Sequence, residues 1–420
     1  MNRSGTQRTA AVSPTAFDNL AFKALFSAAR ERSAARREIR RRAAAAGIRT
    51  ASLSALYEVM GTGAVHGFTV PAINVRGLSY DFIRAIFRAA ARNRVGPFII
   101  EIARSEMHYG EQTTDDLVVM ALCAALRERF AGPLFIQGDH FQVDPSKSVD
   151  EEVAALERLI DASVAAGMGH IDIDASKTVD LSKRKLNDQQ ARNVELTAHF
   201  TEYIRERHGD DVLIGGEIGE IGGRVSTSGD LRAFMSQYRT RIGDVRGIGK
   251  IAVQTGTSHG GTPNRDGSLQ KVIVDVDALE NLSRLAREEF GLAGAVQHGA
   301  STLTERQIAQ FPSLGVAEVH LSSGFQNIVF DHPSFPRQLR EEIYAYLFAH
   351  FADLRKTGMT DQQFIYKQRK RAWGPFKKAI ASLPGDVRRA IATTLEQKVG
   401  SLFNDCKVND TRPLIKKYIH

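Results

Sequence analysis

Three histidines stand at the ends of short apolar runs that lie far apart in the chain. They are His140 in PLFIQGDH, His259 in KIAVQTGTSHGG and His298 in GAVQHGAS. Three neutral imidazole ligands with a fourth position left open are typical of a catalytic zinc site rather than a structural one. A lone histidine at a strand end is more often a hydrogen-bonded residue, so the prediction depends on all three meeting. They meet if the runs are parallel strands of one barrel, whose ends share a rim.

Acidic residues follow the same runs and their neighbours. Asp139 directly precedes His140, and in a regular strand its side chain alternates to the other side. We therefore expect Asp139 to face a substrate as an acid/base without necessarily binding the ion. Asp172 and Asp174 are open to two readings, because they can cap the next helix or orient an imidazole, or else act in catalysis.

Glycine-flanked turns adjoin the second and third histidines. Gly260 and Gly261 follow His259, Gly299 and Ser301 follow His298, and a Ser-Ser-Gly turn ends the last apolar run. Glycines let backbone N–H groups approach an anion closely, and barrels commonly bind phosphate in the loops after strands 7 and 8. These turns predict a phosphorylated substrate.

The elements that must position these residues form a repeating pattern. From about residue 67, eight apolar runs alternate with longer amphipathic stretches, and nearly every run is followed by such a stretch. This βα alternation indicates a parallel sheet, and eight units indicate closure into a (β/α)8 TIM barrel. An open dinucleotide-binding sheet is the alternative, but no G-x-G-x-x-G turn follows the first run.

Helical extensions are expected on both sides of the barrel. We predict a basic helical N-terminal extension over residues 1–66, a catalytic barrel over 67–332 and a C-terminal helical extension over 333–420. Residues 224–247 are predicted to form a long basic loop that could cover an anionic substrate.

The composition narrows the class of protein. The chain has 420 residues, is 43% hydrophobic and contains no apolar run of some 18 residues, so we expect no membrane span and no secretory signal. Cys123 and Cys406 are the only cysteines, which fits a cytoplasmic protein without a disulfide framework. The net charge of +8 is concentrated in residues 30–42 and 367–378. Without any nucleic-acid-reading motif, these runs favour solvated helix faces or a subunit contact over nucleic-acid binding.

Several of these segments resemble the class II, zinc-dependent fructose-bisphosphate aldolases over roughly residues 50–330. The resemblance rests on VPAINV, FIQGDH, GGEIGEIGG, GTSHGG and VQHGAS. It implies that the zinc ligands are His140, His259 and His298, and that Asp139 is catalytic. It also implies an alternative metal contact at Glu217. Contacts to phosphate and to a monovalent cation carry over to Gly260, Gly299 and Ser301.

The resemblance also implies an activity. The family cleaves fructose 1,6-bisphosphate reversibly to dihydroxyacetone phosphate and glyceraldehyde 3-phosphate, a step of glycolysis and gluconeogenesis. Zinc stabilises the enediolate, so no lysine Schiff base is needed, and Asp139 would take the hydroxyl proton. Relatives of this class are dimers or larger, so we expect a homodimer or homotetramer.

The sequence departs from the family on the substrate side. Arg224 and Val225 follow Gly223 where acidic residues usually stand, so Glu220, Glu217 or Asp230 would have to move the carbon-bound proton, and we assign Glu220. The strand-8 donor-binding motif is replaced by a segment in which Ser323 and Asn327 are the expected substrate contacts.

These departures leave other functions open. The alternatives are an aldolase for a different sugar phosphate and a non-catalytic subunit that binds metal or sugar phosphate. A zinc hydrolase on the same barrel is disfavoured by the phosphate-type turns. Arg371 resembles a C-terminal arginine that in the family reaches a neighbouring subunit's distal phosphate, and a solvated basic helix is the other reading.

Overall fold

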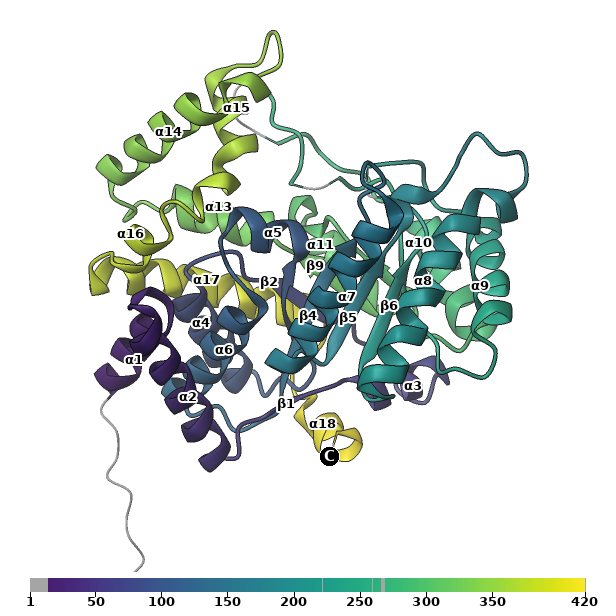
Figure 1. The fold of residues 1–420 in the computed structure, drawn as a ribbon, viewed down its shortest axis with the longest axis horizontal. Helices are drawn as coiled ribbons and strands as arrows, with labels where there is room; N and C mark the ends of the chain where they lie inside the picture. Colours follow the sequence, from purple (N-terminus) through teal and green to yellow (C-terminus); the bar gives the residue numbers. More distant parts are fainter. Residues whose placement is uncertain (1–13, 221, 259, 266–268, 420) are drawn as a thin grey trace, which may run out of the picture.

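A closed parallel barrel forms the centre of the molecule (Figure 1). The computed structural model describes residues 14–220, 222–258, 260–265 and 269–419, so His259 lies outside the described residues. Each strand pairs in parallel with its neighbours and β2 pairs with β9, which closes the barrel. The strands are β2 (Val70–Asn74), β3 (Ile99–Ala103), β4 (Leu134–Gln142), β5 (His170–Asp174), β6 (Leu213–Glu217), β7 (Lys250–Val253), β8 (Ala295–Gln297) and β9 (Glu318–Leu321). The predicted eight-stranded barrel is confirmed, and a two-residue strand, β1 (Thr50–Ala51), is added beside β4.

Helices cover the outside of the barrel, and the strands are therefore buried on both faces. Every residue of β2, β3, β5 and β6 is buried. In α4, Phe82, Ile83, Ile86 and Phe87 supply the apolar face that packs inward. The helices between or after barrel strands are α4 (Ser79–Arg92), α5 (Arg104–Tyr109), α6 (Thr114–Glu128), α7 (Val149–Ala166), α8 (Leu186–His208), α9 (Ser228–Ile242), α10 (Val276–Glu288), α11 (Glu305–Ile308), α12 (Phe311–Leu314) and α13 (Ser323–Asp331).

The segment predicted as a long loop over residues 224–247 is mostly the helix α9, so that prediction is wrong. Thr227 begins the helix with a capping box: its hydroxyl accepts from the Asp230 N–H, and the Asp230 carboxylate accepts from the Thr227 N–H at 2.8 Å. The T-x-x-D pattern was the signal for this start. The helix packs beside α8 on the barrel wall.

The helical extensions are present on both sides of the barrel. The N-terminal helices α1 (Pro14–Phe26) and α2 (Ala29–Ala45) pack on α6, where Arg36 and Arg40 pair with Asp115. Part of the basic run at residues 30–42 is thus used inside the molecule. The helix α3 (Ser54–Gly61) precedes the first barrel strand.

The C-terminal helices run from the barrel mouth around to the far side of the molecule (Figure 1). They are α14 (Arg337–Phe351), α15 (Asp361–Gln368), α16 (Lys377–Ala381), α17 (Gly385–Asp405) and α18 (Arg412–Tyr418). The long helix α17 packs on α4, where Arg88 and Arg92 pair with Glu396. The hydroxyl of Tyr366 on α15 donates to the Gly260 carbonyl at 2.7 Å, which holds α15 over the loop after β7. No helix among the described residues is both long and apolar enough to cross a membrane.

Candidate metal centre and substrate pocket

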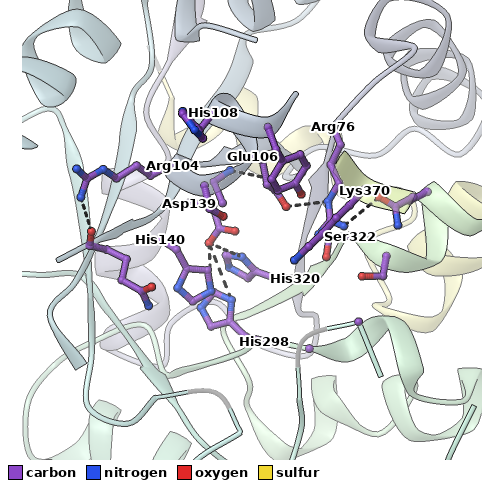
Figure 2. Close-up of a pocket in the computed structure, with 18 of the residues that line it drawn as sticks. Arg76, Arg104, Glu106, His108, Asp139, His140, His298, His320, Ser322 and Lys370 are labelled. Carbon is purple, nitrogen blue, oxygen red and sulfur yellow. Dashed lines mark hydrogen bonds and ion pairs between the residues drawn. The ribbon is translucent and has the colours of Figure 1, made fainter. Parts of the chain in front are cut away.

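A cavity of about 950 Å³ opens where the barrel strands end (Figure 2). Its floor is made of acidic and imidazole side chains, and its walls carry arginine and lysine. The floor residues are Glu101, Asp139, His140, His298 and His320.

Two of the three predicted zinc histidines come together on this floor. His140 lies in β4 and His298 directly follows β8, and their ring centroids are 4.2 Å apart. Asp139 Oδ1 lies 3.8 Å from His140 Nε2 and 4.0 Å from His298 Nδ1. All three side chains are buried. The described residues therefore offer two imidazole nitrogens and a carboxylate oxygen that a single ion can contact.

Asp139 does not alternate away from His140 as a regular strand would require. The pairing of β4 with β5 shifts register between Gly138 and Phe141, and His140 has a φ of +41°. This irregularity turns both side chains toward the barrel mouth, as β-bulges often do beside functional sites. The expectation that the Asp139 side chain alternates to the other side of the strand from His140 is therefore wrong, because its carboxylate lies beside both imidazoles.

Two further carboxylates orient His140. Its Nδ1 lies 3.0 Å from Asp174 Oδ2 and 3.2 Å from Glu217 Oε2. An N–H at Nδ1 that donates to these oxygens directs Nε2 into the cluster, the arrangement typical of a metal-bound histidine. Asp174 also accepts from the backbone N–H and the hydroxyl of Ser176, and its contact with His140 is the imidazole-orienting role that the sequence left open.

The pKa shifts reflect the crowding of carboxylates around His140 in this buried group. Burial, followed by the charge of Asp174, raises the pKa of Glu217 to about 8. Burial also opposes ionisation of Asp174, but hydrogen bonds from His140 and Ser176 outweigh it and leave its pKa below the ordinary value. Burial would lower the pKa of His140, yet Asp139 and Glu217 raise it well above its ordinary value. A buried group with this charge pattern favours a bound cation, and its nitrogen and oxygen ligands suit Zn²⁺, Co²⁺ or Fe²⁺.

Sequence reasoning assigned no role to His320 or to Glu101. Both are buried in the barrel interior, with His320 Nδ1 3.0 Å from Glu101 Oε2. The available signal was the alternation of Glu318 and His320 in the apolar run AEVHL, which puts two ionisable side chains on the same inner face.

A buried ion network lies beneath the candidate metal centre. The Lys250 ammonium, whose side chain is 1% exposed, lies 2.6 Å from Glu318 Oε1 and 3.0 Å from Asp172 Oδ1. It also donates to Gln137 Oε1 at 2.7 Å. The carboxylate of Asp172 thus contacts a buried lysine and does not cap a helix.

The other predicted site residues divide into two groups. Gly260, Gly261, Gly299 and Ser323 line the cavity. Ser301, Asn327 and Glu220 are not among the residues that line it. Ser301 Oγ accepts from the Ser322 N–H at 2.8 Å, and Asn327 lies between Tyr366 and Arg369. Glu220 follows β6 and is exposed.

Cations from distant parts of the chain face the cavity. Arg76, which pairs with Glu106 at 2.7 Å, follows β2. Lys370 and Arg371 come from the 3₁₀ turn η4 (Arg369–Ala372) behind α15, within the same chain. Arg104, Lys147 and Lys177 line another part of the wall. Such a wall suits an anionic substrate.

Known proteins support the fold and the family. The family model for class-II fructose-bisphosphate aldolase matches residues 55–391. A probable tagatose 6 phosphate kinase from Sinorhizobium meliloti 1021 has 17% identity and a TM-score of 0.59, covering 80% of this chain and 100% of its own. A putative fructose-1,6-biphosphate aldolase from Coccidioides immitis has 19% identity and a TM-score of 0.51, covering 85% and 97%.

A third solved structure has the same fold but belongs to an enzyme with a different activity. The fructuronate-tagaturonate epimerase UxaE from Cohnella laeviribosi has 14% identity and a TM-score of 0.56, covering 81% of this chain and 82% of its own. At these identities the structural likenesses show the barrel fold alone, while the family model spans most of the sequence. The chain belongs to the class II fructose-bisphosphate aldolase family.

Proposed function

We propose that this protein is a metal-dependent aldolase that cleaves a ketose bisphosphate reversibly, with fructose 1,6-bisphosphate as the default substrate. The observation that carries the proposal is the buried group of Asp139, His140 and His298 on the floor of a cavity walled by cations. His259, the remaining histidine predicted from the sequence, would be the third imidazole ligand. These residues would hold a zinc ion, which would supply a Lewis acid for the ketose carbonyl.

The residues of the chain perform the remaining tasks. The Asp139 carboxylate takes the proton from the hydroxyl whose carbon becomes the aldehyde, and the carbon–carbon bond then breaks toward the ketose half. Asp174 and Glu217 hold His140 in its binding orientation. The backbone of Gly260, Gly261 and Gly299 is suited to one phosphate group.

The part of the cavity wall that carries arginine and lysine is suited to the second anionic group. Arg76, Lys370 and Arg371 would bind that end of the substrate. Glu220 is our proposed group for the carbon-bound proton. Because it is exposed after β6, its carboxylate would have to move toward the cavity.

The rewritten end of β9 supports a second candidate. His320, Ser322 and Ser323 line the cavity where the family's donor-binding motif is replaced, so the enzyme can be an aldolase for another sugar phosphate. A non-catalytic subunit that binds metal and sugar phosphate is the other alternative.

The test is cleavage of fructose 1,6-bisphosphate and tagatose 1,6-bisphosphate by the purified protein. Turnover is measured as prepared, after EDTA, and after zinc restoration. We expect cleavage that EDTA abolishes and zinc restores. Stoichiometric zinc without cleavage of either sugar would contradict the aldolase proposal for these substrates and favour the binding subunit. Full turnover after complete metal removal would contradict the mechanism.

A further inference from the structure

A second group of metal-type ligands lies directly beside the proposed zinc ligands. It consists of Glu101 on β3, Asp139 on β4 and His320 on β9. His320 Nδ1 lies 3.0 Å from Glu101 Oε2 and 3.4 Å from Asp139 Oδ1. Its ring centroid is 4.1 Å from that of His298, so the two groups adjoin within one cavity floor (Figure 2).

The orientation of His320 is that of a metal ligand. Its Nε2 lies 2.6 Å from Glu318 Oε1, and Glu318 is held in turn by the Lys250 ammonium. An N–H at Nε2 that donates to Glu318 leaves a lone pair at Nδ1. A hydrogen-bonded carboxylate behind an imidazole fixes the tautomer in this way at many metal sites.

The contact between His320 and Glu101 requires a positive centre. The Nδ1 lone pair and a carboxylate oxygen repel one another at 3.0 Å unless a proton or a metal ion lies between them. Glu101 is 0% exposed, and its Oε1 has no hydrogen-bond partner among the described residues. Its Oε2 accepts from the Gln137 amide at 3.0 Å, which is a neutral donor. A proton on His320 is one such centre, but the buried carboxylates of Glu101 and Asp139 together carry more negative charge than one imidazolium neutralises, whereas a divalent cation matches it.

We propose that Glu101, Asp139 and His320 bind a second divalent cation beside the ion at His140 and His298, with Oδ1 of Asp139 bridging the two and Oδ2 left to take the hydroxyl proton. Paired ions in two-metal enzymes lie about 3.5–4 Å apart, which one carboxylate can span. One imidazole and two carboxylates suit Zn²⁺, Co²⁺ or Mn²⁺. The inference rests on the metal part of the proposed function through Asp139, and it is independent of the sugar that is cleaved.

An alternative position for the second ion lies on the other side of His140. His140, Asp174 and Glu217 form another group that could hold a cation. That group lies on β4, β5 and β6, whereas the proposed second site uses β3 and β9, so substitutions separate the two.

Metal content of the full chain tests the proposal. The protein is stripped with a chelator, reloaded with Zn²⁺, passed over a desalting column and measured by plasma mass spectrometry. We expect two ions per wild-type chain, one in Glu101→Gln and one in His320→Ala. Glu152→Gln is the matched control, a buried glutamate that pairs with Arg104 outside these groups, and should retain two, whereas Glu217→Gln tests the alternative group. Circular dichroism and thermal melting verify that each variant is folded.

Electron paramagnetic resonance of the Mn²⁺-loaded wild type tests the same point without any variant. Two bridged Mn²⁺ ions give an exchange-coupled multiline spectrum, and Glu101→Gln should leave the six-line spectrum of one ion. A single uncoupled ion in the wild type would overturn the second site and leave the proposed function standing. Two ions in Glu101→Gln with one in Glu217→Gln would also overturn it. No bound metal at all would overturn both proposals.

Discussion

Asp139 and His298 lie side by side on the cavity floor, yet we assign them different tasks. Asp139 Oδ1 is within 4.0 Å of both His140 and His298, so the carboxylate can move a proton at the cavity floor while the imidazoles hold the ion. We expect Asp139→Ala to lower kcat by about 10²–10⁴-fold, the usual loss of a general acid/base, while one ion stays bound. His298→Ala should lose that ion together with turnover.

Steady-state kinetics and metal analysis on the same samples check this division. Asp139→Asn, which keeps the side chain's size, controls for packing and should be as slow as Asp139→Ala. A metal-free Asp139→Ala protein that is still folded would contradict the assignment, since it would make Asp139 essential for holding the first ion.

The sequence predicted the site best where a residue lies near or just after the end of a strand. His140 and His298 could be placed on one rim because strands of a barrel end together. His320 and Glu101 were not assigned, since an ionisable residue inside an apolar run looks the same whether it faces the barrel interior or a helix. The position of Asp139 depends on a register shift and a positive φ at His140, which no residue pattern announces.

At the scale of elements, the turn η4 brings two cations to the cavity from a segment more than 200 residues beyond β4. Arg76 is already paired with Glu106, whereas Lys370 lies over the Tyr109 ring and has no carboxylate at ion-pair distance among the described residues. Partial loss of water and the charge of Arg76 lower the pKa of Lys370, a crowding that a bound phosphate would relieve.

We therefore expect Lys370→Met to raise KM for a bisphosphate substrate about 10–150-fold, because a charge-assisted hydrogen bond contributes about 1.5–3 kcal/mol. The value of kcat should change far less, since the contact is remote from the bond that breaks. Lys356→Met, in an exposed turn away from the cavity, is the control. Equal KM values for the two variants would show that η4 does not contact the substrate.

The elements themselves followed from the sequence where period and capping agreed. All eight barrel strands were found because each apolar run has a helical pattern close behind it. The helix α9 was taken for a loop because its polar and basic residues hide the buried face formed by Leu231, Phe234, Met235 and Tyr238. Its Thr227–Asp230 capping box was the stronger signal.

At the scale of the whole molecule, Lys250 ties opposite sides of the barrel together. Its ammonium on β7 contacts Glu318 on β9, Asp172 on β5 and Gln137 on β4. Replacing one partner of a buried ion pair leaves the other charge uncompensated. Lys250→Met should therefore lower the free energy of unfolding by about 3–5 kcal/mol. Urea unfolding at pH 7 measures this, with exposed Lys378→Met as control, and a loss below about 1 kcal/mol would mean that the network is relaxed by water or protonation.

His170 is the first residue of β5, at the end of the barrel away from the cavity, and it makes the fold sensitive to acid. Its Nε2 accepts from the Leu53 N–H at 2.8 Å, just before α3, and its ring stacks on Phe135. Burial, followed by the charge of Lys250, lowers the pKa of His170 to about 3. An unfolded chain binds a proton here below about pH 6.5, whereas the folded chain does not, so acid favours unfolding.

We expect His170 alone to remove about 2 kcal/mol of stability between pH 7 and pH 5, from the shift of an unfolded-state pKa near 6.5. In His170→Gln the amide oxygen can still accept from Leu53, but nothing titrates in this range. Urea unfolding of both proteins at pH 7, 6 and 5 should thus show wild type losing its advantage over the variant as the pH falls. Parallel curves of unfolding free energy against pH would mean that His170 takes up a proton within the folded chain. The Leu53 N–H would then separate from the His170 ring without unfolding.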